Sequence, residues 1–314
     1  MRTVFTALRH AISAGKNTVL VTILSHTGSA PRGAGSQMLV GKHGLMAGTV
    51  GGGAVEGRAI EEALRLLQEG GGAEIREYPL HPSLKDDLGM VCGGEVTVLL
   101  SPVTPAWGDA VENVEARFRG QTGGTLWLST KDNSAPIVTD KGAECPADGY
   151  FPVNMPASQR VVIFGAGHIS RALTPLLRMV DFEVTVFDDR PEFAVKEAFP
   201  HAETVLCGSY DTIEELLPLK DDDFIIVLTS GHSNDFQVLE QVLRREFPYV
   251  GVIGSAAKTA AVNKRLWAAG ISKEATDRVH TPIGLAIGAV TPEEIAISIT
   301  GELIAVRAAM RKEK

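Results

Sequence analysis

Two glycines and an aspartate in the middle of the chain have the spacing of a nucleotide-binding turn. Gly165 and Gly167 follow the apolar run Val161–Phe164, and a segment with helical periodicity comes directly after them. Gly165 suits a tight turn, Gly167 lets the backbone approach a pyrophosphate, and the N-terminus of the helix presents unpaired N–H groups to the anion. Asp188 lies 21 residues after Gly167, where its carboxylate would accept a hydrogen bond from a ribose hydroxyl. This spacing predicts a site for a dinucleotide such as NAD(P).

Two histidines and a further glycine belong to the same predicted site. His168 directly follows Gly167, and His232 lies in the sequence TSGHSND, just after the apolar run Phe224–Leu228. Gly254 follows the next predicted strand. Ligands of doubly wound folds bind at the carboxyl ends of the parallel strands, so we expect His168, His232 and Gly254 to lie at that edge. Each histidine can bind a metal, move a proton or simply cap a helix.

Cys92 is the candidate for sulfur or metal chemistry in the first half. It precedes Gly93 and Gly94 in a polar loop, so its sulfur has no bulky neighbour on that side. Neighbouring N–H groups favour the thiolate, which is the form that binds metals or attacks sulfur. The alternative interpretation is a small free cysteine that fills a gap in a turn. Cys92 is therefore the predicted catalytic and metal-binding residue.

The first half also contains two glycine-rich loops that suit a phosphate. One of them has three successive glycines: Gly51, Gly52 and Gly53. They precede the predicted helix Ala54–Glu69, whose N-terminus adds partial positive charge. Glu56, in the first turn, either caps this helix or binds a polar ligand. In the other loop, Arg32 adds a cation among glycines.

Composition indicates an ordinary globular α/β protein. The chain has 314 residues, of which 44% are hydrophobic, 22% are charged and 33 are glycine. A net charge of −8 without a block of Lys or Arg argues against a nucleic-acid partner. No apolar run approaches the roughly 20 residues needed to span a bilayer, so we expect no membrane partner. The three cysteines lie far apart without a CxxC pair, which fits a reducing cytoplasm.

Hydrophobic periodicity predicts an α/β protein with an N-terminal mixed α/β domain over residues 1–105 and a C-terminal Rossmann-like doubly wound parallel-sheet domain over residues 158–314. In the second domain, apolar runs alternate with helical segments. Residues 106–157 are weakly patterned, with a helix near 110–119 and a strand near 125–129. We predict that this segment is an extension and linker. The elements predicted in the first domain are a helix over 3–14, strands over 18–24, 37–40 and 45–49, a helix over 54–69, and strands over 74–80 and 95–100.

Several motifs occur along both halves of the chain. Those of the first half are GSAPRGAGSQMLV, GTVGGGAVEG and MVCGGEVTVLL. Those of the second half are VVIFGAGHIS, VFDDRPEFA, TSGHSNDFQVLE, YVGVIGS and PIGLAIGAVTPEEIAISI. In this order they resemble the XdhC/CoxI family, the accessory proteins of xanthine dehydrogenase and related molybdenum hydroxylases. Two positions depart from the pattern: Ser170 replaces the usual third small residue of the turn, and Ala256 and Ala257 stand where basic residues are common.

The resemblance implies a maturation factor and cofactor chaperone more than a catalyst. Such a protein binds molybdenum cofactor, protects it while a cysteine desulfurase supplies the terminal sulfur, and transfers it to the apo-subunit of a molybdenum hydroxylase. We also expect a homodimer. Molybdenum cofactor is an anionic, phosphate-bearing pterin, with which the glycine loops and Arg32 are compatible, and a soft thiolate such as Cys92 suits molybdenum.

Two other functions stay open at this stage. The Rossmann half alone is compatible with an NAD(P)-dependent oxidoreductase, for which His168 and His232 are the candidate bases. A scaffold with a vestigial nucleotide pocket is the second alternative, and Ser170 is the reason to consider it.

Overall fold

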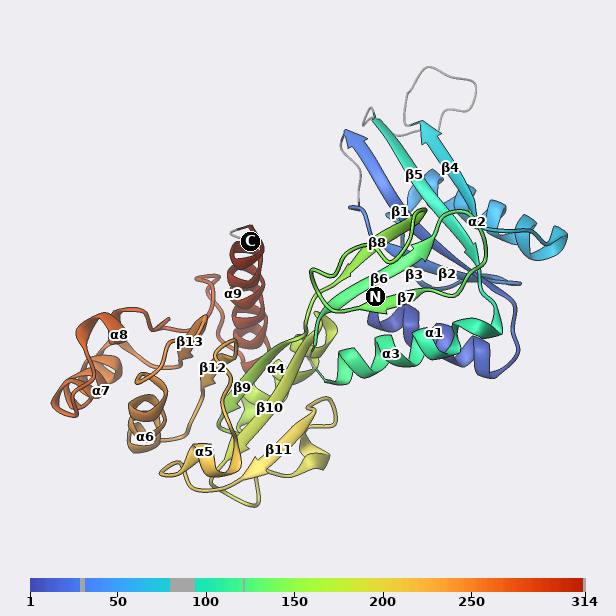
Figure 1. The fold of residues 1–314 in the computed structure, drawn as a ribbon. Coiled ribbons are helices and arrows are strands. Elements are labelled where there is room, and N and C mark those ends of the chain that lie inside the picture. The colour runs from blue at the N-terminus through green and yellow to red at the C-terminus, as the bar shows by residue number, and fades with distance from the viewer. Residues whose placement is uncertain (29–31, 80–93, 121, 313–314) are drawn as a thin grey trace. The chain divides into compact units, whose positions relative to one another are not determined.

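In a computed structural model, the chain forms two compact units, Met1–Ala157 and Ser158–Lys314 (Figure 1). The structure describes residues 1–28, 32–79, 94–120 and 122–312. Each unit has its own hydrophobic core, so each is considered by itself.

The first unit is built on an antiparallel sheet with the strand order β3-β2-β1-β5-β4. The elements of this part are α1 (Arg2–Ser13), β1 (Thr18–Gly28), β2 (Gln37–Gly41), β3 (Gly44–Gly48), α2 (Gly53–Glu69), β4 (Glu74–Pro79) and β5 (Gly94–Pro102). They agree with the predicted helices, strands and hairpin to within a few residues at each end. The central strand β1 pairs with both β2 and β5.

Both faces of this sheet are covered. Val19, Val21 and Ile23 of β1 lie in a buried cluster with Val55 and Leu66 of α2. The intervening Leu20 lies in a second cluster with residues of α1. Successive strand residues point to opposite faces, so a strand covered on both sides is apolar at every position. This explains why residues 19–24 of β1 are apolar at every position except Thr22, whose hydroxyl accepts a hydrogen bond from the Gln37 side chain.

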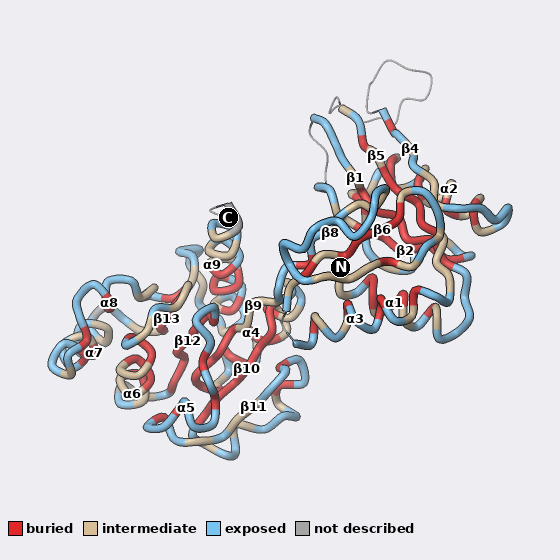
Figure 2. The backbone as a smooth tube through the Cα atoms, in the orientation of Figure 1, coloured by how far each residue is buried: buried red, intermediate tan, exposed pale blue. Residues whose placement is uncertain are grey.

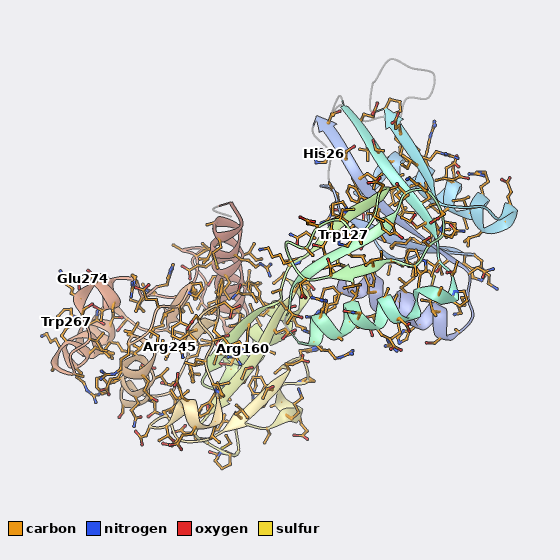
Figure 3. The ribbon with its side chains drawn as sticks, viewed as in Figure 1. His26, Trp127, Arg160, Arg245, Trp267 and Glu274 are labelled. Atoms are coloured by element: carbon orange, nitrogen blue, oxygen red, sulfur yellow. The ribbon has the colours of Figure 1, made fainter. Side chains whose placement is uncertain are left out.

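Residues 106–157, predicted as an extension and linker, belong to the first unit, and several of their side chains lie in its core. The segment contains η1 (Pro105–Trp107), α3 (Gly108–Arg119), β6 (Gly124–Ser129), β7 (Ile137–Thr139) and β8 (Tyr150–Met155). The strands form a small antiparallel sheet, in which the indole N–H of Trp127 donates to Thr139 Oγ1 over 2.9 Å (Figure 3). Val153 and Met155 are only 1% exposed. β8 alternates exposed and buried residues and contains Pro152, which weakens its pattern in the sequence.

The second unit has a parallel sheet with the strand order β11-β10-β9-β12-β13. Its elements are β9 (Gln159–Phe164), α4 (His168–Met179), β10 (Phe182–Asp188), η2 (Lys196–Ala198), β11 (Thr204–Cys207), α5 (Ile213–Leu216), β12 (Phe224–Val227), α6 (His232–Val242), β13 (Tyr249–Val252), α7 (Ala256–Ala268), α8 (Lys273–Asp277) and α9 (Pro292–Lys312). The predicted fold class, with a Rossmann-like domain after a mixed α/β domain, is confirmed.

Helices cover both faces of the parallel sheet. β10, β12 and β13 are buried along their whole length, whereas β11 at one edge is intermediate or exposed (Figure 2). Val161 and Ile163 of β9 pack in a cluster with residues of α4 and α9. Val162 and Phe164 pack on the other face, in a cluster with residues of α5, α6, α7 and α8. A strand buried on both faces needs an apolar residue at each position. The apolar run that marked the nucleotide-binding turn therefore follows from its place at the centre of the sheet.

The strand order creates a crevice at the carboxyl edge of the sheet. The chain runs from β9 outward to β10 and β11, and then returns to the other side of β9 to form β12 and β13. The connections leave β9 and β12 in opposite directions, and ligands of doubly wound folds bind at such a reversal point. At the amino edge of the sheet, an ion pair joins β9 to the residue before β12. Arg160 Nη2 lies 2.6 Å from Asp223 Oδ2 (Figure 3).

Among the residues that the structure describes, no helix combines the length and the apolar character needed to cross a membrane.

Residues 158–314, produced alone, should fold as an independent unit. The reason is that both of the buried clusters around the parallel sheet consist of residues from this range. Circular dichroism during heating should show one cooperative transition and a helical spectrum. A fragment without cooperative unfolding, next to a full-length chain that has it, would contradict the division into two units.

Candidate functional site

The turn after β9 requires glycine at its first position. Gly165 has a φ of +112°, and a Cβ built on it would lie 2.4 Å from the carbonyl oxygen of Leu228. The Gly165 N–H donates to the Phe187 carbonyl oxygen over 2.8 Å, which ties the turn to the end of β10. The left-handed backbone and the close approach of Leu228 both exclude a side chain here. The turn is therefore tight, and the N-terminus of α4 lies directly at the carboxyl edge of the sheet.

Gly167 leaves open space at the N-terminus of α4. Its φ of −79° is ordinary, and a Cβ built on it would meet no atom within 4 Å. A hollow of about 280 Å³ lies at this point, lined by Gly167, His168, Ile169, Ser170, Leu228, Ile253 and Pro292. N–H groups in the first turn of a helix have no partner within the helix and carry partial positive charge. The hollow thus combines room, backbone donors and the exposed side chain of His168.

Ser170 fits the turn without closing it. Its side chain is fully buried, and its hydroxyl donates to the Gly165 carbonyl oxygen over 2.5 Å. The hydroxyl therefore satisfies a backbone acceptor inside the turn, and Ser170 forms part of the lining of the hollow.

Asp188 connects the glycine turn to the end of β10. Its buried carboxylate accepts hydrogen bonds from the Ala166 N–H at 2.6 Å and from the Arg190 guanidinium at 2.8 Å. Burial raises the pKa of Asp188, but the donors on Arg190 and Ala166 outweigh it and lower the pKa below its ordinary value. Asp188 is thus held ionised, with both oxygens engaged inside the protein. The ribose contact predicted for it would require these bonds to be rearranged.

Asp189 is the exposed carboxylate at the end of β10. It accepts a hydrogen bond from the side-chain amide of Asn234 over 3.2 Å. Partial burial and the neighbouring charge of Asp188 raise the pKa of Asp189. Sequence spacing alone pointed to Asp188 and missed Asp189 and Asn234. The available signal was the pair of adjacent aspartates, because neighbouring residues of a strand point to opposite sides.

The ends of β12 and β13 meet the glycine turn. Leu228 follows β12 and Ile253 follows β13, and both line the hollow together with Gly167. Gly254 lies in the β13–α7 turn, and His232 is the first residue of α6. The structure therefore brings Gly165, Gly167, His168, His232 and Gly254 to one edge of one sheet.

In the first unit, the three-glycine loop binds a carboxylate of the protein itself. Gly51, Gly52 and Gly53 all have positive φ angles; Gly52 is the N-cap of α2 and Gly53 is its first residue. Glu56 Oε2 accepts hydrogen bonds from the N–H groups of Val50 and Gly52, each over 3.1 Å, and from the Thr49 hydroxyl over 2.5 Å. These bonds favour the capping role for Glu56, since its side chain already occupies the N–H group of Gly52, one of the donors expected to hold an anion.

Two further residues of the first unit, Arg32 and Cys92, were predicted to belong to the site. Arg32 is exposed. Cys92 lies outside the described residues, so its predicted role in sulfur or metal chemistry stays a prediction. In the part of the chain that is described, His, Cys, Asp and Glu side chains form no group of three or more that could hold a metal ion.

Both units match the models of one protein family. Residues 11–79 match the XdhC and CoxI family, and residues 161–303 match the XdhC Rossmann domain. The chain belongs to the XdhC/CoxI family. This agrees with the resemblance carried by the motifs in the sequence.

Named relatives of this XdhC/CoxI chain come from two bacteria. A probable xanthine dehydrogenase subunit of Bacillus subtilis strain 168 is 26% identical, over 92% of this chain and 93% of its own length. The molybdenum cofactor insertion chaperone PaoD of Escherichia coli K12 is 25% identical, over 98% of this chain and 88% of PaoD. The uncharacterized protein YqeB, also of Escherichia coli K12, is 28% identical over 92% of this chain, which spans only 43% of YqeB.

A solved structure has the same fold. The crystal structure of a xanthine dehydrogenase from Bacillus halodurans matches this XdhC/CoxI chain with a TM-score of 0.81 and 25% identity. The match covers 99% of this chain and 96% of that chain.

Glu56→Gln should destabilise the protein more at neutral than at acidic pH. Burial raises the pKa of Glu56, but the hydrogen bonds from Thr49, Gly52 and Val50 together lower it below 4.5. A lowered folded-state pKa means that the ionised carboxylate stabilises the fold above about pH 4.5, and that this stabilisation is lost as the pH falls through the folded-state pKa. Loss of this cap should cost about 1 kcal/mol at pH 7.

Thermal unfolding of the wild type and the variant at pH 7 and at pH 3.5 measures this difference. Glu61→Gln, at an exposed position of the same helix, is the matched control and should change the melting temperature little at either pH. An equal effect of Glu56→Gln at both pH values would contradict the assigned role of the carboxylate.

Proposed function

We propose that this protein is a maturation factor that binds molybdenum cofactor and supports its sulfuration and insertion into a xanthine-dehydrogenase-type molybdenum hydroxylase. In this proposal a cysteine desulfurase supplies the sulfur, the apo-subunit of the hydroxylase receives the cofactor, and a homodimer of this chain acts in the cytoplasm. The protein holds and transfers the cofactor, and the hydroxylase performs the catalysis.

The observation that carries the proposal is the hollow at Gly167. A phosphate needs converging N–H donors and a space that no side chain fills, and both occur at the N-terminus of α4. The phosphate of the pterin would be held by the backbone of Gly167, His168 and Ile169, with the His168 side chain beside it. The name of the relative PaoD, a molybdenum cofactor insertion chaperone, supports the choice of ligand.

Ser170 was the reason to consider a scaffold with a vestigial pocket. Because its side chain fits inside the turn, it no longer favours that alternative. The NAD(P) alternative retains one specific observation, namely the exposed Asp189 at the end of β10, where a ribose hydroxyl would be bound. A binding experiment with the pterin cofactor and with NAD+ separates the two ligands.

Gly167→Val should abolish binding of molybdenum cofactor while the fold is retained. The valine side chain would enter the hollow and would clash with no protein atom at its Cβ position. The measurement is the fluorescence of the oxidised pterin that co-elutes with the protein after incubation with cofactor released from a molybdenum hydroxylase.

Gly108→Val is the matched control for this experiment. Gly108 begins α3 with an αR backbone, and a Cβ built on it also meets no atom within 4 Å. This variant should retain as much pterin as the wild type. Full pterin retention by Gly167→Val would show that the cofactor binds elsewhere, and binding of NAD+ alone would favour the oxidoreductase.

Cys92→Ser should leave the stability unchanged and should impair activation of the client hydroxylase. The substitution is nearly isosteric, but a hydroxyl cannot replace a soft thiolate toward molybdenum or sulfur. The assay is the hydroxylase activity obtained after maturation with cysteine desulfurase and each variant.

Cys145→Ser and Cys207→Ser are the controls, since both thiols are exposed in the structure. They should support maturation as the wild type does. Normal activation by Cys92→Ser would remove this residue from the proposed mechanism.

A further inference from the structure

A buried ion pair lies near the reversal point of the strand order, between β9 and β12. It has no role in the site described so far. Lys258 Nζ, from the first turn of α7, is 2.5 Å from Asp235 Oδ2 in the first turn of α6. Asp235 is fully buried and the Lys258 side chain is 18% exposed. The other carboxylate oxygen of Asp235 accepts a hydrogen bond from the Thr229 hydroxyl over 2.5 Å. Thr229 therefore fixes the carboxylate, and the carboxylate in turn fixes the ammonium group.

The pair lies at the carboxyl edge of the sheet. Thr229 comes two residues after the end of β12, and the Lys258 stem crosses the β13–α7 turn, with Cδ 3.2 Å from the position a Cβ on Gly254 would take. Ile253 lines both the hollow at Gly167 and a small cavity bounded by Asp235 and Lys258. Ile253 thus lies between the cavity that holds the ammonium group and the hollow at the N-terminus of α4.

The pair contributes little to the net stability of the fold. Removal of two charges from water costs about as much as their mutual attraction returns, so a buried ion pair adds little net stability. A lysine ammonium held at a fixed position is, however, a suitable point charge for a phosphate. A ligand that begins at the Gly167 turn and extends over β12 and β13, as ligands at a switch point do, reaches this part of the edge.

We propose that Lys258, held in position by Asp235, binds an anionic phosphate group of the ligand that enters the hollow at Gly167. This inference rests on the proposed function for the identity of the ligand as a pterin, but not for its phosphate chemistry.

The test separates ligand binding from structural support. Lys258→Met alone leaves the buried Asp235 carboxylate without its counter-ion and should lower the melting temperature. The double variant Lys258→Met, Asp235→Asn removes both charges and keeps an acceptor for the Thr229 hydroxyl, so its melting temperature should return close to that of the wild type. Lys264→Met, at an exposed position of the same helix, is the control for the loss of one positive charge.

Two probes are used with the full-length chain: molybdenum cofactor released from a hydroxylase, measured by pterin fluorescence, and inorganic pyrophosphate, measured by calorimetry. The double variant should bind the probes about 10- to 100-fold more weakly than the wild type, as expected for a lost charged hydrogen bond, and Lys264→Met should bind normally. A stable double variant that binds both probes as the wild type does would overturn the inference. Pyrophosphate binding that depends on Lys258 without any pterin binding would support the inference and contradict the proposed function.

Discussion

One buried carboxylate holds together the carboxyl edge of the sheet in the second unit. Asp188 binds the N–H of Ala166 inside the turn and the guanidinium of Arg190 after β10, so it connects the end of β10 to the turn that follows β9. The same turn depends on Gly165, whose positive φ allows Leu228 of the neighbouring connection to approach. These two constraints fix the direction of α4, and the direction of α4 decides where an anion can bind.

The fold was predictable wherever burial dictates the residue type at every position. β1 and β9 are buried on both faces, and their apolar runs identified them directly in the sequence. The segment 106–157 has the pattern of a linker because β8 is half exposed and contains Pro152, and because β7 is only three residues long. β11, α5 and α8 were also missed, since elements of four or five residues carry too little periodicity to be recognised.

The site was predictable from sequence at the level of the turn and not at the level of its side chains. Spacing located Gly165, which the turn requires because of its positive φ, and Gly167, whose role in binding stays a prediction. It could not distinguish Asp188, which is engaged inside the protein, from the exposed Asp189, because one residue of register decides which of them faces outward. Likewise, the capping bonds of Glu56 and the pairing of Asp235 with Lys258 depend on contacts made only in the folded chain.

The central claim is that the hollow at the carboxyl edge of the parallel sheet receives molybdenum cofactor. Mass spectrometry of the small molecules released by denaturation, from protein produced in a host that synthesises this cofactor, tests the claim most directly. The account predicts a pterin released in proportion to the protein, and none from a preparation made in a host that cannot synthesise the cofactor. Release of a nicotinamide nucleotide in place of the pterin, from the host that makes both, would contradict it.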